Sequence, residues 1–317
     1  MEAATGRRRI GQEKLGFAGF EERRRSSLDE VDGLIDWTPI AEALNGIHDA
    51  AKGEPAWPPL ALFKAVLISI WYDVSDVKLA EALDDRVSFR RFCGFSRDEA
   101  TPERTAFVRF RRELTARGLD RIPFEGITAA LKARAVTIKT GTIVDATVIR
   151  SASEADADAR WSGHRARRAI HGYKAHVGAD AETALVEELD VTSGNVHDGR
   201  AGGGALPDSP GIVYADSAYR GETFGSAVRA RGGTPHVVLT AMWGMPGDDT
   251  MQKLRRWNHG VQRIRCRIEK ILGTWKRSYG LRRMRWRGLA KATLQVRLTA
   301  IAYNLRRSIR LALPKPA

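Results

Sequence analysis

The sequence predicts an all-helical region up to about residue 135 and a mixed α/β domain after it. Before that point apolar residues recur at helical spacing, as in PLALFKAVLISIW (59–71). After it, short β-branched runs bounded by glycine or serine alternate with helical stretches, which is typical of a sheet flanked by helices. The expected parts are a basic flexible arm over 1–30, a helical domain over 31–135 and an α/β domain over 136–317.

The N-terminal arm carries arginine clusters at 7–9 and 23–25 and is either a DNA-contacting arm or a solvated tail. Helices are expected at 59–71 and 77–83, the second capped by Ser75, because a serine hydroxyl accepts a hydrogen bond from a first-turn backbone N–H. Another helix is expected from about Pro102, with Thr101 as its cap.

The helix after Pro102 has an apolar stripe of Phe107, Phe110 and Leu114. Its basic residues fall on other faces: Arg104, Arg109, Arg111 and Arg112. Two interpretations remain open, a helix that presents arginines to DNA and a salt-bridged surface helix.

The α/β domain is expected to hold five strands and at least three helices. The strands are expected near 143–149, 173–178, 185–191, 212–214 and 235–239, and the helices near 222–231, 262–276 and 294–305. This order is typical of a ribonuclease-H-like fold, so we expect a mixed five-stranded sheet flanked by helices. The polar segment 151–170 is expected to be a loop, either gripping DNA through Arg165, Arg167 and Arg168 or serving as a disordered connector.

Three acids stand where such a fold could bring them together. Asp145 interrupts the apolar run TIVDATVI, Asp216 ends the strand in GIVYAD, and Glu269 lies on the helix that follows. Clustered carboxylates repel one another unless a cation neutralises them, so their joint placement predicts a site for a hard divalent metal such as Mg²⁺. Arg265 and Lys276 share the polar stripe of Glu269 and are expected to neutralise phosphate charge.

Two further pairs are candidate site residues. Lys174 and His176 alternate with apolar residues along one expected strand, so they should share a face, with Lys174 near DNA and His176 supporting the acids. His197 and Asp198 are neighbours whose side chains diverge, so capping or support of the acids is expected rather than a general-base pair.

The motifs carry a family resemblance. They are PPLALFKAVLISIWYDVSDVKLAEAL, VSFRRFCGF, TIVDATVI, HGYKAHVGAD, VTSGNVHD, VYADSAYRG, Arg265-x3-Glu269-x6-Lys276 and AIAYNLRR. Together they resemble the insertion-sequence transposases of the DDE type, the fifth insertion-sequence group above all, over residues 31 to 310. The family often has tyrosine three positions before the arginine of the helix motif, where this chain has Gln262.

Charge and cysteines agree with such a protein. The net charge is +14, and from Met251 onward there are 19 lysines and arginines against one acid, Glu269, which predicts a phosphate-contacting surface. Cys93 and Cys266 lack metal-ligand spacing and are expected to be buried, reduced thiols. No apolar run reaches the length of a membrane span, so we expect an intracellular protein. The resemblance implies a cytoplasmic, nucleoid-associated protein of bacteria.

The resemblance implies a transposase that binds the terminal inverted repeats of its element and catalyses DNA cleavage and strand transfer. Asp145, Asp216 and Glu269 would hold two Mg²⁺ ions, with Mn²⁺ as a substitute. The implied partners are double-stranded DNA at the element ends and target, and a second copy of the chain in a homodimer or higher oligomer. The alternatives are a metal-dependent nuclease of the same fold and a non-catalytic, domesticated DNA-binding repressor.

Overall fold

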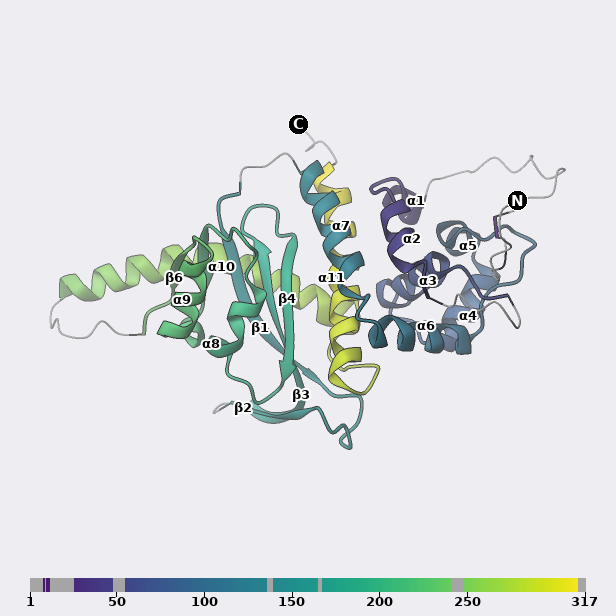
Figure 1. Ribbon diagram of the computed structural model, residues 1–317. Helices are drawn as coiled ribbons and strands as arrows, with labels where there is room; N and C mark the ends of the chain where they lie inside the picture. The colour runs from purple at the N-terminus through teal and green to yellow at the C-terminus, as the bar shows by residue number, and fades with distance from the viewer. Residues whose placement is uncertain are drawn as a thin grey trace. The chain divides into compact units, whose positions relative to one another are not determined.

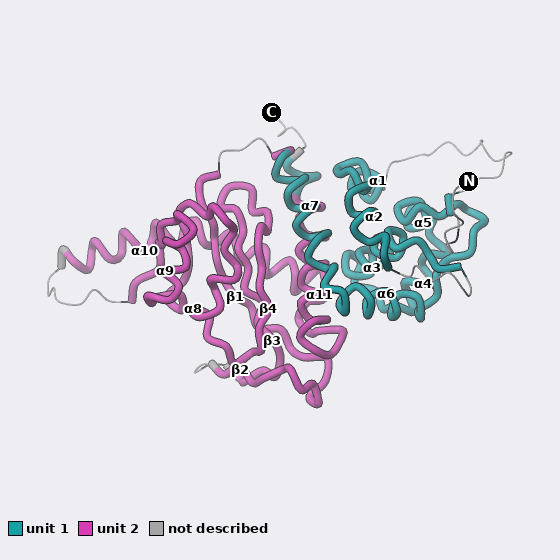
Figure 2. Tube along the Cα trace, viewed as in Figure 1, with its two compact units in different colours: residues 1–133, 308–317 teal, residues 134–307 magenta. Residues whose placement is uncertain are grey.

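The computed structural model describes residues 8, 10–11, 26–47, 55–135, 139–164, 167–240 and 248–312. The chain divides into two compact units, one of residues 1–133 with 308–317 and the other of residues 134–307 (Figure 2). Most of the expected N-terminal arm, and Arg165, lie outside the described residues. Among the described residues, no helix combines the length and the apolar character needed to cross a membrane.

The helical unit is built around α3. Its helices are α1 (Ser27–Asp32), α2 (Thr38–Leu44), α3 (Pro59–Trp71), α4 (Asp76–Asp85), α5 (Val87–Cys93), α6 (Arg104–Ala116) and α7 (Arg121–Arg134). All but one of the residues of α3 are buried, so the helix forms the centre of this core. Its single cation, Lys64, donates to Asp32 Oδ1 at 2.6 Å and lies 4.4 Å from the centre of the Trp37 ring.

Of the two N-caps expected from the sequence, the one at Ser75 is confirmed and the one at Thr101 is not. Ser75 accepts a hydrogen bond from Lys78 N at the start of α4, as expected. The cap expected at Thr101 is wrong, because α6 starts at Arg104, after an extended Glu103. Pro102 is buried ahead of the helix, and the Thr101 hydroxyl donates to Asp84 instead.

Asp29 ties α1 to α5 and is expected to make stability depend on pH. Hydrogen bonds from Arg91 hold the pKa of Asp29 at about 2, below its ordinary value of 3.8. The contribution is therefore complete above about pH 4 and is lost as the pH falls through 2. We expect Asp29→Asn to lower the free energy of unfolding by about 1–2 kcal/mol at pH 7.

Thermal denaturation of the full chain between pH 7 and pH 3 measures this effect. The difference in melting temperature between wild type and Asp29→Asn should shrink at the acid end of this range. Glu30 is an exposed acid in the same helical turn, so Glu30→Gln should change the melting temperature little. A difference that stays constant with pH would mean that the carboxylate charge is not what stabilises the α1–α5 contact.

The α/β unit contains one mixed sheet. Its strands are β1 (Thr142–Arg150), β2 (Arg160–His164), β3 (Arg167–Asp180), β4 (Val186–Ser193), β5 (Ile212–Ala215) and β6 (Thr234–Val237). The order is β2-β3-β1-β5-β6, and β4 also pairs with β3. The pairs of β3 with β1, β2 and β4 are antiparallel, and those of β5 with β1 and β6 are parallel.

The sheet of the described residues has six strands, so the expected count of five is wrong. The additional strand is β2, in a segment expected to be a loop or connector. It pairs with the first part of β3 and β4 pairs with the rest, along the same edge. A solvent-exposed hairpin needs no apolar run, which is why the polar residues of this segment did not predict a strand.

Helices cover both faces of the sheet. They are α8 (Asp198–Ala201), η1 (Gly202–Ala205), η2 (Ser217–Tyr219), α9 (Glu222–Ala230), α10 (Asp248–Ser278) and α11 (Leu289–Ala312). In Figure 1 α10 crosses behind the sheet and α8 lies in front of it. On the α8 side η1 approaches β3 so closely that a Cβ at Gly178 would stand 1.9 Å from the carbonyl oxygen of Ala205, which only glycine tolerates.

The two cysteines differ in exposure. Cys93 is buried in the helical unit, where burial strongly raises the pKa of its thiol. Cys266 is exposed, so the expectation that both thiols are buried is wrong. It lies on the solvent side of α10, where its thiol donates to the carbonyl oxygen of Arg263.

Candidate catalytic site

Asp145 lies in the middle of β1 on the face that α10 covers. Its side chain is only 14% exposed. Oδ1 accepts a hydrogen bond from Ala146 N at 2.9 Å, and Oδ2 accepts one from Arg265 Nη2 at 3.1 Å. Burial raises the pKa of Asp145, and the charge of Arg265 opposes that rise. The position therefore holds a carboxylate that depends on a nearby cation.

Asp216 follows the last residue of β5, the neighbouring strand. It is two residues beyond Tyr214, so both share one face of the strand. Its Oδ1 accepts from Ala218 N at 2.8 Å and caps the short helix η2, which fixes the carboxylate at the strand end. Its side chain is about one-third exposed, more open than Asp145.

One guanidinium joins the two acids. Arg265 Nη2 lies 3.1 Å from Asp145 Oδ2 and 3.7 Å from Asp216 Oδ2, so the two carboxylates face a single cation. The position of Arg265 follows from α10, whose buried residues recur at heptad spacing: Leu254, Val261, Ile268 and Trp275. Arg265 follows Val261 by four residues and is held at the edge of that buried stripe.

Glu269 lies one helical turn beyond Arg265 and is exposed. It is on the flank of α10 that carries Arg265, since residues four apart share a helix face. Among the described residues, no three histidine, cysteine or acidic side chains are grouped closely enough to hold a metal ion. Thus the structure brings Asp145 and Asp216 together, whereas Glu269 is exposed and is not grouped with them.

The chemistry of the two joined acids suits a hard divalent cation. Their donors are carboxylate oxygens, and a positively charged group already stands between them. Arg265 Nε is buried and has no hydrogen-bond partner among the described residues, so the guanidinium is only partly satisfied. Lys276, partly exposed, lies three turns along the same helix.

Lys174 and His176 share a face, as expected, but it is the face opposite to that of Asp145. His176 pairs with Ala146 in the β1–β3 register, and facing residues of antiparallel strands point to the same side. Lys174 Nζ donates to Asp198 Oδ1 at 2.9 Å and to Val196 O at 2.8 Å. Lys174 therefore anchors α8 to the sheet.

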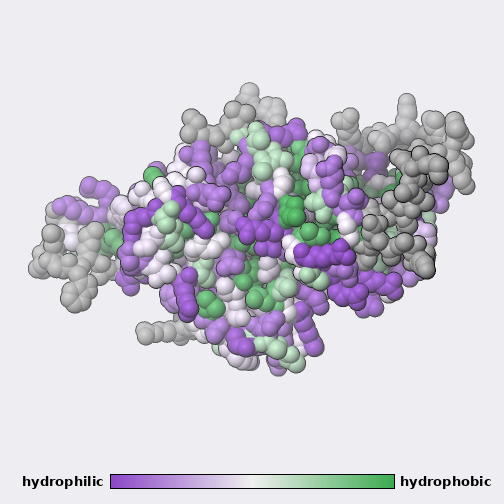
Figure 3. All heavy atoms as spheres, in the orientation of Figure 1, coloured by the Kyte–Doolittle hydropathy of each residue, from purple (hydrophilic) through white to green (hydrophobic). Residues whose placement is uncertain are grey.

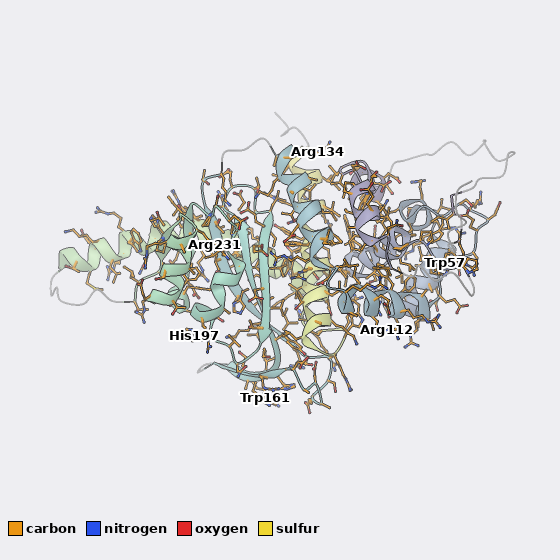
Figure 4. All side chains as sticks on the ribbon, in the orientation of Figure 1. Trp57, Arg112, Arg134, Trp161, His197 and Arg231 are labelled. Atoms are coloured by element: carbon orange, nitrogen blue, oxygen red, sulfur yellow. The ribbon has the colours of Figure 1, made fainter. Side chains whose placement is uncertain are left out.

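His176 is fully buried and its Nε2 lies 3.0 Å from Thr192 Oγ1. Burial lowers the pKa of His176, which favours the neutral ring. His197 is exposed at the lower left of the α/β unit (Figure 4), and its Nδ1 accepts from Gly199 N, which caps α8. Capping is one of the two roles expected for it.

Tyr219 is a neighbour of the acids that the sequence did not indicate. The side chain is 1% exposed, and its hydroxyl has no hydrogen-bond partner among the described residues. Burial raises the pKa of Tyr219 well above its ordinary value, and the charges of Asp145, Asp198 and Asp216 raise it further. Its place in YADSAYRG, three residues after Asp216, is the only signal that could have marked it.

The arginines of α6 fall into two groups. Arg104, Arg109 and Arg112 are exposed, and Figure 4 shows Arg112 directed away from the helix. Arg111 is 5% exposed and forms two hydrogen bonds to Asp76, of 2.8 and 2.6 Å, that hold α6 to the start of α4. On the β2–β3 hairpin Arg168 is exposed, and the side chain of Arg167 is outside the described part of the structure.

Comparison with known families gives two matches. The family described as Transposase DDE domain matches residues 137–305, which include both aspartates, Arg265 and Glu269. The family described as Transposase domain (DUF772) matches residues 18–113, which include most of α6. No solved structure matches the chain.

Proposed function

The chain belongs to the transposases with a DDE domain, and from this premise we propose that it binds the terminal inverted repeats of an insertion sequence of the fifth group and catalyses DNA cleavage and strand transfer there. The observation that carries the proposal is the single guanidinium that joins Asp145 and Asp216 at neighbouring strands, one helical turn from Glu269. Residues 136–317 would be the catalytic domain and residues 31–135 the DNA-binding domain.

We further propose that the sheet is of the ribonuclease-H-like type. Without β2, the strand order is β4-β3-β1-β5-β6, in which the first three strands are antiparallel and the last two join in parallel. This arrangement sets Asp145 on the central strand and Asp216 at the end of the next one. The acids therefore converge from elements that are far apart in the sequence.

The proposed mechanism assigns a role to each side chain. Asp145, Asp216 and Glu269 would be the carboxylate ligands of two Mg²⁺ ions, which Mn²⁺ could replace. When bound, these ions supply Lewis-acid stabilisation of the attacking and leaving oxygens of a phosphodiester. The carboxylates hold negative charge at fixed positions, and the cap on η2 prevents Asp216 from turning away. No covalent bond between protein and DNA is needed.

Arg265 would exchange partners when DNA binds. A guanidinium pairs as well with a phosphate as with a carboxylate, so a DNA phosphate at this edge offers it an alternative to Asp145 and Asp216. Arg265 and Lys276 would then neutralise phosphate charge beside the acids. Joining two element ends requires two copies of the site, so we propose that the chain acts as a homodimer or higher oligomer on double-stranded DNA.

Transfer of a pre-cut element end into a target duplex tests the proposed function. The wild-type protein with Mg²⁺ or Mn²⁺ should join the 3′-hydroxyl of the end to target DNA. Cutting of uncut ends with no joining of pre-cut ones would show a nuclease instead. Binding of the ends without either reaction would show a DNA-binding protein that has lost its chemistry.

The exposed stripe of α6 is proposed to contact DNA. Hydrophilic residues cover the region of α6 in Figure 3. Arg104, Arg109 and Arg112 are exposed on this helix. We expect Arg109→Ala and Arg112→Ala each to weaken binding of a terminal-repeat duplex severalfold and to reduce the slope of log affinity against log salt by about 1, the value for one phosphate contact.

Arg111→Ala is the contrasting variant on the same helix. Removing it leaves Asp76 without its ion-pair partner, so we expect a lower melting temperature and no specific change in the salt slope. Titration of a labelled duplex at several salt concentrations measures the slopes. Unchanged slopes for Arg109→Ala and Arg112→Ala would remove α6 from the DNA contact.

A further inference from the structure

A hollow lies against α10, on the opposite flank from Arg265. Its volume is about 470 Å³, within the range of small-molecule sites. It is lined by residues of the N-terminal half of α10 and of the strands β5 and β6. Its aromatic and cationic lining residues are Tyr214, His236, Trp257, Lys253, Arg256 and Arg263.

Three aromatic rings follow one another along this hollow. The rings of Tyr214 and His236 meet edge to face with centroids 5.7 Å apart, and those of His236 and Trp257 lie 4.7 Å apart. Trp257 is 37% exposed, and its Nε1 donates to Val237 O at 3.0 Å, which fixes the indole against β6. A partly exposed indole held in one orientation offers a planar surface for stacking.

Cations surround these rings. Lys253, Arg256 and Arg263 are exposed at the rim, and none of the described residues that line the hollow is acidic. Aromatic side chains beside a positively charged rim are the two features by which proteins bind single-stranded nucleic acid, the rings stacking on bases and the cations contacting phosphates. A duplex does not fit this chemistry, because its base faces are covered by neighbouring bases.

We propose that this hollow binds a nucleotide of single-stranded DNA, with the base stacked against Trp257 and His236 and the phosphate held by Arg256 and Arg263. The assignment of the nucleic acid as DNA rests on the proposed function. Tyr214 lies on β5 and precedes Asp216 by two residues, so the hollow begins about 7 Å along the chain from Asp216. It would hold unpaired DNA next to the cleavage site.

Comparison with an oligonucleotide that lacks bases separates the contribution of base stacking to binding from that of the phosphate contacts. The full chain, without divalent metal, is titrated with a labelled thymidine octamer and with an abasic octamer that carries the same phosphates. We expect the wild type to prefer the thymidine octamer at least about fivefold, the lower bound for stacking of one base. Trp257→Ala should abolish the preference, and Trp257→Phe, which keeps a stacking ring, should retain most of it.

Matched variants separate this hollow from other exposed groups. Trp161 is 60% exposed on the β2–β3 hairpin (Figure 4), so Trp161→Ala should leave the preference unchanged. Arg256→Gln should weaken the binding of both octamers alike. Arg255 is an exposed neighbour outside the hollow, so Arg255→Gln should weaken the binding of either octamer only by the loss of one surface charge.

Several results would overturn the inference. They are equal binding of the two octamers by the wild type, a preserved preference in folded Trp257→Ala, and loss of the preference in Trp161→Ala. An RNA octamer that binds as tightly as the DNA would refute the assignment to DNA. Because no metal and no cleavage enter this test, its failure is independent of any failure of the catalytic proposal.

Discussion

Replacing Asp216 with asparagine is expected to reduce metal-dependent cleavage of element ends by at least about 10³-fold while leaving end binding nearly unchanged. Asparagine keeps the carbonyl oxygen that accepts from Ala218 N, so η2 and the fold should survive. What is lost is the negative charge that a metal ligand needs. Even the partners that support metal ligands contribute about 10–100-fold, so a direct ligand should contribute more.

The rate of cleavage is measured on a labelled element end in Mg²⁺. The affinity is measured by titration of the same DNA without metal. Asp208→Asn is the matched control, because Asp208 is an exposed acid just before β5. This variant should cleave DNA at the wild-type rate. If Asp216→Asn cleaved at an appreciable fraction of the wild-type rate, Asp216 would not be a catalytic residue.

Replacing Arg265 with alanine should have the second-largest effect, on both activity and stability. Asp145 would keep its burial but lose the cation that opposes the rise of its pKa, so that pKa should rise further. At neutral pH the free energy of unfolding should fall by about 1–3 kcal/mol, because a buried carboxylate is left unpaired. The loss should shrink as the pH falls and Asp145 becomes protonated.

Cleavage by Arg265→Ala should fall about a hundredfold, because the proposed phosphate contact is lost along with the alignment of the two acids. Arg265→Lys keeps the charge but not the planar pair of donors, so it should lie between alanine and wild type. Lys270→Ala, at an exposed cation on the same helix, is the control. Wild-type cleavage and stability in Arg265→Ala would show that the guanidinium is incidental.

Local patterns predicted most of the elements of the α/β unit, because each strand near the site is a short apolar run. The order of strands and helices, typical of a ribonuclease-H-like fold, predicts that Asp145 and Asp216 come together, and the structure pairs the strand of Asp145 with the strand that precedes Asp216. The face that each strand turns to α10 depends on register, which local patterns do not contain. Lys174 was therefore assigned to DNA, although the Ala146–His176 pairing turns its face toward α8.

The burial of Arg111 can be predicted from the sequence. It lies four residues after Phe107 and three before Leu114, so helical spacing places it on the buried face of α6. Its charge favours the polar faces of the helix, where Arg104, Arg109 and Arg112 lie. Arg265 is different, since its position between two acids depends on how α10 crosses the sheet, and no local signal predicts that crossing.

If Glu269 joins Asp145 and Asp216 as a metal ligand during catalysis, Glu269→Cys should change which metal ion supports cleavage. A thiolate binds Mg²⁺ poorly and Mn²⁺ better, because softer metals accept sulfur. We predict that this variant cleaves element ends at least about a hundredfold more slowly than the wild type in Mg²⁺ and recovers much of the loss in Mn²⁺. Cleavage by Glu269→Cys in Mg²⁺ at a rate close to that of the wild type would contradict the claim.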